Sequence, residues 1–373
     1  MSDPATSLYA DYRAKRYFGS LDGFRALSII AVIWHHTGGD IVGNGIPMLK
    51  LGFLGVDMFF VISGFLIVTL LLRERDRTGG ISLKGFYLRR TLRIFPIYYG
   101  IMAALAALFL FVRSGSPMAQ AFWQELPYYL TYTSNWTHTA VFAVAWSLAC
   151  EEQFYLIYPP IEKFLRKWVL PAIVAFIFVN QLANFGILDP FFESLLGTAE
   201  LEVLQATFTP ICLGVVVAHV LHHKSGFDAL ARIFGHPFMP LVCGGVLLVS
   251  LNLPFDDISG LPRLLTQLIM TGLLLSCVMR EDHVIDRPMR SFFFKRIGLV
   301  SYGMYLYHMF VREAMSRGLP QNLFDQPLLR FGLCLVVTWV IAEVSFKLVE
   351  SPILAYKDRL KHRAEAKLAA ERN

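Results

Sequence analysis

The strongest constraint on this chain is its division into apolar blocks about twenty residues long, the length that a helix needs to cross a membrane. The chain is 55% hydrophobic and 17% charged, whereas soluble domains carry about a quarter charged residues. Ten blocks qualify, at residues 21–39, 52–72, 94–112, 139–160, 169–187, 201–221, 238–253, 264–279, 298–315 and 328–349. The sequence therefore predicts an all-α, polytopic membrane helix bundle with about ten transmembrane helices.

Charge sorting along the chain predicts its orientation. Lysines and arginines gather in alternate connections, and positive connections face the cytoplasm, so both termini are expected on the cytoplasmic side. No internal boundary is evident, so we expect one membrane domain at 1–355 and a charged cytoplasmic tail at 356–373. The net charge of +6 is attributed to these topology signals and to membrane lipid headgroups rather than to nucleic acid. The five cysteines lack metal or redox spacing, and no metal site is predicted.

The first block carries an arginine and a histidine, Arg25 and His36, that a helix places on one face. Eleven positions separate them by about 16 Å along the axis and about 20° around it. His35 points about 80° away from Arg25. An ionisable group inside a membrane segment costs several kcal/mol and is a candidate for function. The alternative for His36 is a structural histidine with one hydrogen bond to a neighbouring helix.

Two carboxylates also lie in apolar segments, Asp57 early in the second block and Glu151 in the fourth. Asp57 is expected at the depth of His36, where a carboxylate holds an imidazole in one tautomer. Tyr155 lies one turn after Glu151 on the same face. Further along the chain, Ser301 and His308 share a face of the ninth block with a tyrosine between them.

Three arginines stand at the mouth of the third block, and two of them, Arg89 and Arg90, are adjacent. The guanidinium fork suits phosphate groups. The alternative interpretation is a positive-inside signal with snorkelling side chains. The chain has no nucleotide-binding loop, zinc signature or nucleophile elbow, so an activated donor must bring its own energy.

Taken together, these patterns resemble the membrane acyltransferase-3 family, bacterial multi-span enzymes that O-acylate carbohydrates and other hydroxyl-bearing molecules. The resemblance is carried by five motifs in the family's order, at 21–36, 55–65, 86–90, 146–156 and 301–308. It implies a ten-span core in a bacterial inner membrane and no bound cofactor. It also implies an acyl-CoA donor (usually acetyl-CoA) and a hydroxyl acceptor on a carbohydrate or glycolipid. Only a charged tail follows Glu350, so we expect the membrane core to complete the transfer.

The resemblance also gives the candidate residues their expected roles. His36 is expected to act as general base toward the acceptor hydroxyl, or to carry the acyl group itself. Glu151 and Asp57 are expected to orient His36 or to neutralise Arg25. The expected CoA-binding residues are Arg25, Arg89 and Arg90. The expected acceptor or oxyanion contacts are Ser301, Tyr302 and His308.

Other functions remain open from the sequence. A transporter or flippase for a lipid-linked or polar solute also uses intramembrane His, Glu and Arg, although no internal repeat or pair of broken segments is evident. A non-sugar acceptor such as a macrolide is a further alternative. The aromatic-rich segment 113–138 is interpreted as an interfacial aromatic belt, or else as a sugar-stacking loop.

Overall fold

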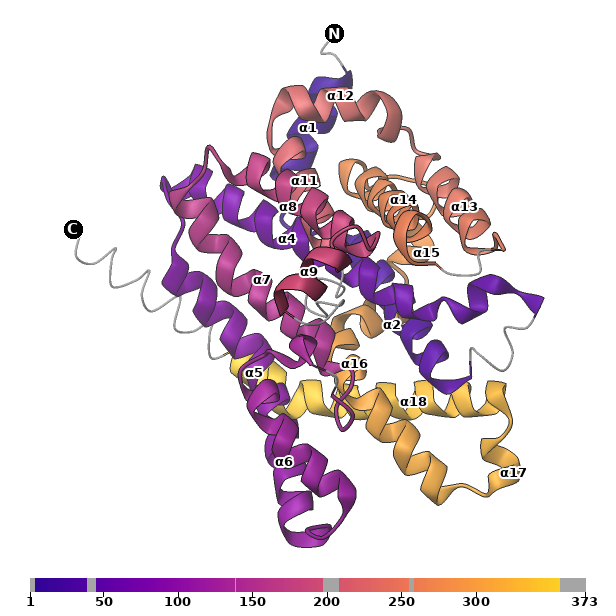
Figure 1. The fold of residues 1–373 in the computed structure, drawn as a ribbon. Coiled ribbons are helices and arrows are strands. Elements are labelled where there is room, and N and C mark those ends of the chain that lie inside the picture. Colours follow the sequence, from indigo (N-terminus) through magenta and orange to yellow (C-terminus); the bar gives the residue numbers. More distant parts are fainter. Residues whose placement is uncertain (1–3, 39–44, 138, 197–207, 255–257, 356–373) are drawn as a thin grey trace, which may run out of the picture.

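The computed structural model describes residues 4–38, 45–137, 139–196, 208–254 and 258–355, and every regular element in these ranges is a helix (Figure 1). The first half contains α1 (Pro4–Ala14), α2 (Gly19–Thr37), η2 (Pro47–Lys50), η3 (Gly52–Leu54), α4 (Gly55–Thr78), α5 (Leu83–Ala107), η4 (Leu108–Val112), α6 (Pro117–Leu130), η5 (Ser134–Trp136) and α7 (Ala145–Phe164). The second half contains α8 (Val169–Asn184), α9 (Asp189–Leu196), α11 (Thr209–His222), α12 (Lys224–Phe234), α13 (Met239–Leu251), α14 (Gly260–Met279), α15 (Asp286–Met289), α16 (Phe292–Gly318), α17 (Gln321–Phe324), α18 (Pro327–Ser345) and η6 (Phe346–Glu350). The predicted tail at 356–373 lies outside the described residues.

The prediction of a polytopic helical membrane protein is confirmed. Each of the ten predicted ranges overlaps at least one of these helices. Within the described ranges, four stretches are long and apolar enough to cross a membrane, and up to seven qualify if each bent helix pair counts as one span. The four are Gly52–Thr78, Leu83–Val112, Gly260–Met279 and Pro327–Ala355. The count of ten spans stays a prediction.

Three pairs of consecutive helices in the described ranges meet at a sharp bend. The chain bends by 71° between α1 and α2, by 85° between α8 and α9, and by 68° between α12 and α13. Gly186, in the break between α8 and α9, has a left-handed φ of 70° that glycine adopts without strain. The three breaks lie at residues 15–18, 185–188 and 235–238, outside or at the ends of the predicted blocks 21–39, 169–187 and 238–253, so the hydropathy within those blocks does not report them.

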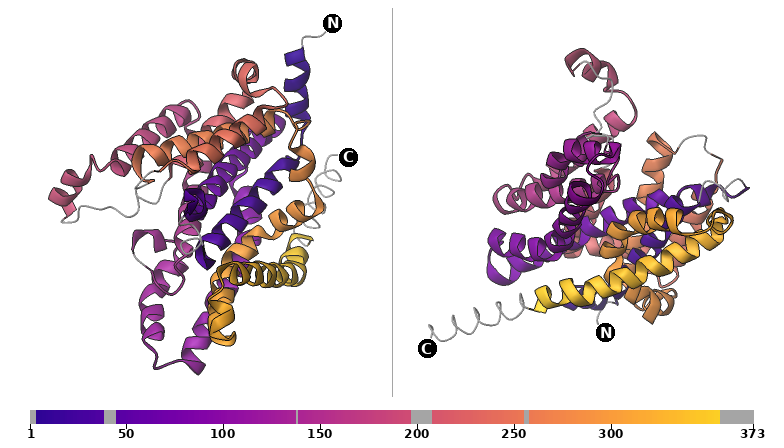
Figure 2. Two further views of the ribbon diagram at one scale, coloured as in Figure 1. Left: turned by 90° about the vertical axis from the view of Figure 1, so that its right-hand side faces the viewer. Right: turned by 90° about the horizontal axis from the view of Figure 1, so that it is seen from below.

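The centre of the bundle is formed by α2, α4, α11 and α16. Helix α2 packs against both α4 and α16, α11 lies along α4, and α18 covers α16 (Figures 1 and 2). A Cβ atom on Gly64 would overlap the carbonyl oxygen of Ile211, and one on Gly214 would overlap that of Val61. Small residues at such crossings let membrane helices approach closely. The α4–α11 contact is therefore a backbone-to-backbone packing that larger side chains would prevent.

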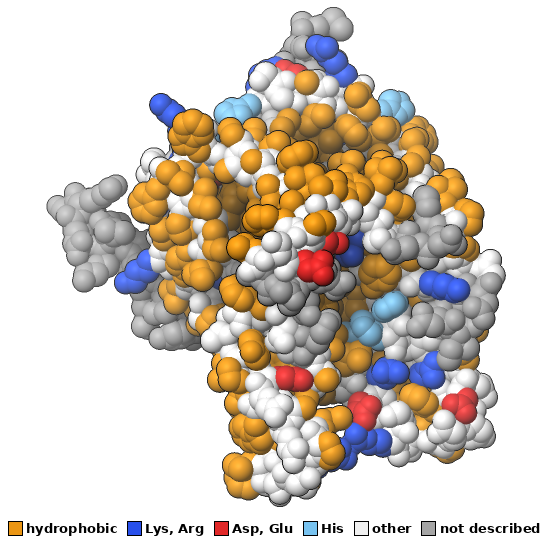
Figure 3. Space-filling view, viewed as in Figure 1, with side chains coloured by type: hydrophobic (Ala, Val, Ile, Leu, Met, Phe, Trp, Pro, Cys, Tyr) orange, Lys and Arg blue, Asp and Glu red, His pale blue; other side chains and the backbone are white. Residues whose placement is uncertain are grey.

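Many large apolar side chains lie on the outer surface. In the Gly52–Thr78 stretch, 78% of the most apolar window is buried, whereas in Pro327–Ala355 only 17% is buried. Helix α4 is thus a central span and α18 a peripheral one. Large exposed side chains such as Leu241, Val249 and Leu328 cover helices on the outside, and the face in Figure 3 is mostly hydrophobic with scattered charges. A membrane replaces water as the solvent of this surface.

The aromatic-rich segment at 113–138 contains a helix rather than only a loop. Helix α6 begins after Ser116, whose hydroxyl accepts a hydrogen bond from the Ala119 amide at 3.2 Å, and Pro117 occupies its first turn. Its aromatic residues divide between the interior, with Phe122 buried, and the surface, with Trp123 exposed. Both interpretations of the segment, belt and sugar-binding surface, therefore stay predictions. The five cysteines are free and buried, as predicted for small apolar residues.

Candidate active site

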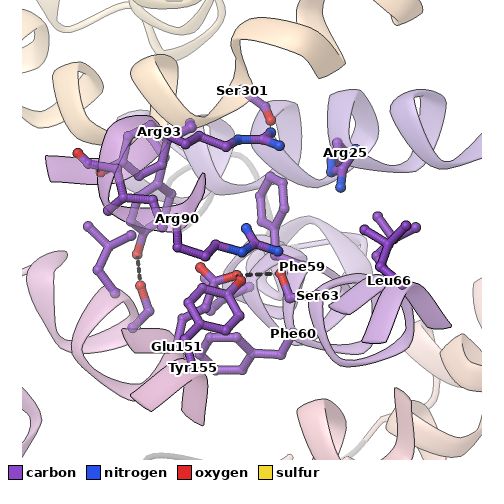
Figure 4. Close-up of a pocket in the computed structure, with 17 residues that line it drawn as sticks. Arg25, Phe59, Phe60, Ser63, Leu66, Arg90, Arg93, Glu151, Tyr155 and Ser301 are labelled. Atoms are coloured by element: carbon purple, nitrogen blue, oxygen red, sulfur yellow. Dashed lines mark hydrogen bonds between the residues drawn. The ribbon is translucent and has the colours of Figure 1, made fainter. Parts of the chain in front are cut away.

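A cavity of about 160 Å³ opens between α2, α4, α5, α7 and α16 (Figure 4). Its apolar wall comes mainly from α4, with Phe59, Phe60 and Leu66. Its polar lining comes from all five helices and consists of Arg25, Ser63, Arg90, Arg93, Ser147, Glu151, Tyr155, Ser301, Tyr302 and Tyr305. All five sequence motifs therefore contribute polar groups to one cavity. Such a concave, partly apolar site with a few convergent polar groups is typical of a ligand pocket.

The cavity has an excess of positive charge. Arg25, Arg90 and Arg93 line it together with a single carboxylate, Glu151. Arg25 is also paired with Asp22 at 3.0 Å, the i, i+3 pair that the sequence suggests. The guanidinium of Arg90 lies 4.4 Å from the centre of the Tyr155 ring, a cation–π contact that orients its fork. Three converging guanidiniums favour an anionic ligand.

One of the predicted CoA-binding arginines lies elsewhere. Arg89 pairs with Glu74 at 3.0 Å, its side chain is 48% exposed, and it does not line the cavity. Arg93 lines the cavity instead. The two residues are four positions apart and so project from nearly the same face of α5, but Arg93 lies about 6 Å further along the axis. The sequence places Arg93 in the same arginine cluster as Arg89. It does not show that Arg89 pairs with Glu74 on α4 while Arg93 lines the cavity.

Glu151 lies inside the cavity and is held by two hydroxyls. One of its oxygens accepts hydrogen bonds from the Ser63 hydroxyl and from the Tyr155 hydroxyl (Figure 4). The contact with Tyr155 follows from their spacing of four residues on α7, as the sequence indicates. Ser63 comes from α4 and belongs to the second motif, but it was not predicted as a site residue. The carboxylate therefore joins α4 and α7 beside the arginines.

His36 faces the bundle interior, as the helical spacing predicts. Its Nδ1 lies 2.9 Å from the Val32 carbonyl oxygen and 3.2 Å from Nε2 of His308 on α16. His35 points elsewhere, because its Nδ1 lies 3.3 Å from the Lys50 carbonyl oxygen. Arg25 and His36 thus face α16 together, one beside the cavity and the other further along the helix.

The structure does not bring Asp57 to His36. Both oxygens of the fully buried Asp57 carboxylate are bound by Arg263 on α14, at 3.1 and 3.0 Å, and Gln267 donates a further hydrogen bond at 2.9 Å. Asp57 stands in the first turn of α4, on the side that meets α14. The sequence places Asp57 and His36 at one depth but does not indicate the face of α4 from which the carboxylate projects.

The remaining predicted residues lie along α16. Ser301 and Tyr302 line the cavity, but their hydroxyls donate to the carbonyl oxygens of Gly298 and Ile94, at 2.9 and 3.0 Å. Tyr305 closes the cavity, with its hydroxyl 2.6 Å from that of Ser147. His308 is fully buried one turn beyond, with its ring centre 5.7 Å from that of Tyr305. The pair of His308 and His36 therefore stands just behind the cavity wall rather than in its lining.

A glycine at the start of α16 permits the close approach of α2 and α16. A Cβ atom on Gly298 would overlap the carbonyl oxygen of Asp22. This contact fixes the start of α16 against the turn of α2 that carries Arg25. Within the described ranges, no group of three His, Cys, Asp or Glu side chains is arranged to hold a metal ion.

Comparison with known families gives the family of this chain. The model of a family described as acyltransferase domain matches residues 18–344, which include every lining residue of the cavity. The chain belongs to the acyltransferase-3 family. All five motifs of the sequence lie within the matched range, and the structure gathers all five around one cavity.

The curated relatives are bacterial O-acetyltransferases. The chain is 29% identical over 91% of its length to peptidoglycan O-acetyltransferase OatA of Listeria monocytogenes, and 26% identical over 91% of its length to O-acetyltransferase OatA of Staphylococcus aureus. These matches cover 56% and 57% of the relatives, so the chain spans about half the length of these proteins. A putative O-acetyltransferase of Staphylococcus aureus is 35% identical over 42% of this chain and 26% of its own length. No solved structure gives a significant match.

Proposed function

We propose that this protein transfers an acetyl group from acetyl-CoA to a hydroxyl of a cell-surface polysaccharide. The observation that carries the proposal is the geometry of α2, which presents Arg25 to a three-arginine cavity and His36 to α16 about 16 Å further along one face. That separation suits a donor with its phosphates at one end and its thioester at the other.

The donor would enter the cavity with its phosphates among the arginines. Arg25, Arg90 and Arg93 supply forked, permanently charged donors, and Tyr155 holds one of them by its ring face. The apolar wall of Phe59, Phe60 and Leu66 suits the uncharged arm. The thioester would then lie toward Tyr305, the residue that separates the cavity from His308. The positive-inside pattern supports a cytoplasmic position for the arginine end, on the side where acyl-CoA is made.

The acceptor is proposed from the relatives. Two of them are named for O-acetylation, one of them of peptidoglycan, and they match 91% of this chain. A polysaccharide of the cell wall or a glycolipid precursor therefore comes first among hydroxyl acceptors. The exposed aromatic side chains near α6, such as Trp123 and Trp136, offer surfaces on which a sugar ring can stack.

In the proposed chemistry, His36 takes the proton of the acceptor hydroxyl as the oxygen attacks the acetyl carbon. The carbon–sulfur bond then breaks, and the leaving thiolate receives that proton from His36, so that free CoA and the ester are the products. Glu151 neutralises part of the arginine charge when the cavity holds no donor. Asp57 has no part in this step, because Arg263 and Gln267 occupy its oxygens.

The test compares two adjacent histidines. His36→Ala should abolish transfer from radiolabelled acetyl-CoA in a membrane preparation, whereas His35→Ala, whose ring faces Lys50 and Phe53, should retain most of it. Mass spectrometry of surface glycans from cells with and without the gene identifies the acceptor. Loss of transfer in His35→Ala with full activity in His36→Ala would contradict the proposal.

The three bent helix pairs favour one competing function, a transporter or flippase, because discontinuous helices build many transport sites. A transporter leaves the thioester intact. Release of free CoA that depends on an acceptor would therefore exclude it, and transport of a solute without CoA release would support it.

A further inference from the structure

Two imidazoles from different helices meet at the end of the cavity. We propose that His308 is a positioning residue for His36: it accepts the Nδ1 hydrogen of His36, keeps the reactive lone pair on Nε2, and shares the positive charge that His36 acquires in the reaction. The inference rests on the proposed function, in which His36 is the general base.

The first step fixes the hydrogen of His308. Its Nδ1 lies 2.7 Å from the carbonyl oxygen of Tyr305. A carbonyl oxygen only accepts hydrogen bonds, so Nδ1 of His308 must carry the hydrogen. A neutral imidazole has one N–H, and Nε2 of His308 is then an acceptor. Its side chain is fully buried, which favours this neutral form.

The second step fixes the hydrogen of His36. Its Nδ1 faces two acceptors, the Val32 carbonyl oxygen at 2.9 Å and Nε2 of His308 at 3.2 Å. Nδ1 must therefore be the donor. In neutral His36 the lone pair that takes a proton then lies on Nε2. The contacts with the Tyr305 carbonyl, with the Val32 carbonyl and between the two rings all agree with a hydrogen on Nδ1 of each histidine. Together they specify one tautomer for each ring.

The third step concerns the charged state. As Nε2 of His36 takes the acceptor proton, its Nδ1–H becomes a cationic donor, and hydrogen bonds from ionised donors are about twice as strong as neutral ones. His308 gives this donor a second acceptor in a buried environment, where such bonds are strengthened. Without His308, the Nδ1–H of His36 loses this acceptor and keeps its contact with the Val32 carbonyl. His308 thus acts on the step that forms the imidazolium and not on donor binding.

The packing around the pair holds both rings in place. The centres of the two rings are 5.0 Å apart. The thiol of Cys334 on α18 donates to the carbonyl of His308 at 3.7 Å. Arg330 of α18 binds the carbonyl oxygen of Thr37, the residue after His36. Helix α18 therefore contacts the backbone of His308 and that of the residue after His36.

The direct test is the tautomer itself. The purified full-length protein, labelled with ¹⁵N at histidine, is studied by NMR at about pH 8, where histidines are neutral, and His36→Gln identifies the His36 signals. We expect the hydrogen on Nδ1 of His36 and an unprotonated Nε2. A hydrogen on Nε2 of His36 would overturn the proposal. This measurement needs no substituted His308 and no activity.

The kinetic test uses two variants at one position. His308→Ala should lower kcat about 10- to 100-fold, less than the ~10⁴-fold loss when a triad carboxylate is replaced, with the KM for acetyl-CoA unchanged. His308→Gln should recover most of kcat, because its amide oxygen can accept from Nδ1 of His36. Equal losses in both variants, or full activity in His308→Ala, would overturn the inference.

The controls separate this inference from the proposed function. His236→Ala, at an exposed position, should leave kcat unchanged. An inactive His36→Ala together with a fully active His308→Ala refutes only the role of His308. An active His36→Ala refutes the proposed function itself.

Discussion

Arg93 gives the sharpest test of the donor site, because the chain supplies a matched control one turn away. Arg93→Ala removes a guanidinium that lines the cavity, whereas Arg89→Ala removes one that pairs with Glu74 outside it. Both variants lose one positive charge from the same helix. Arg93→Ala should nevertheless raise the KM for acetyl-CoA more than Arg89→Ala does.

The magnitude follows from the kind of contact. A hydrogen bond to a charged group contributes about 1.5–3 kcal/mol, and about 1.4 kcal/mol corresponds to a factor of ten in affinity. Loss of the Arg93 contact with a phosphate should therefore raise the KM for acetyl-CoA about 10- to 150-fold. Exposed pairs such as Arg89–Glu74 contribute about 0–1 kcal/mol, so Arg89→Ala should change this KM by less than about fivefold.

The assay is the initial rate of acetyl transfer in membranes over a range of acetyl-CoA concentrations. Acetyl-pantetheine, which lacks the phosphates, serves as a second donor. Arg93→Ala should be impaired with acetyl-CoA but should match the unmodified protein with acetyl-pantetheine. An unchanged KM in Arg93→Ala, or an equal rise in Arg89→Ala, would refute the assignment of the cavity to the donor.

Three further predictions concern stability. Gly64→Ala should lower the thermal midpoint of the purified protein, since overpacking against α11 costs about 1–3 kcal/mol, while Gly100→Ala, with open space around it, should leave the midpoint unchanged or raised. Arg263→Ala should lower the midpoint more than Gly64→Ala does, because an unpaired buried Asp57 costs about 3–5 kcal/mol. A midpoint within a degree or so of that of the parent protein would argue against the buried pair. Burial lowers the pKa of His283, so the folded state favours its neutral form and loses stability as the pH falls below about 6.5. His283→Gln should therefore make the thermal midpoint fall less steeply between about pH 7 and 5. An unchanged slope of midpoint against pH would contradict this.

The sequence by itself determined the helical membrane class and the face of the first long helix. Apolar blocks of membrane length become helices because the backbone must satisfy its own hydrogen bonds in lipid. The spacing of Arg25 and His36 fixes their common face, because helical geometry is local. The structure confirms that His36 faces α16 and His35 does not.

Only the tertiary structure decided which residues from different helices meet. Asp57 binds Arg263 from a segment more than two hundred residues away, and Glu151 binds Ser63 of α4. Arg93 lines the cavity, whereas the guanidinium of Arg89 pairs with Glu74 outside it. A one-dimensional pattern gives the direction of a side chain relative to its own helix. The partner depends on the rotation and crossing of the neighbouring helix, which close backbone contacts between distant segments set.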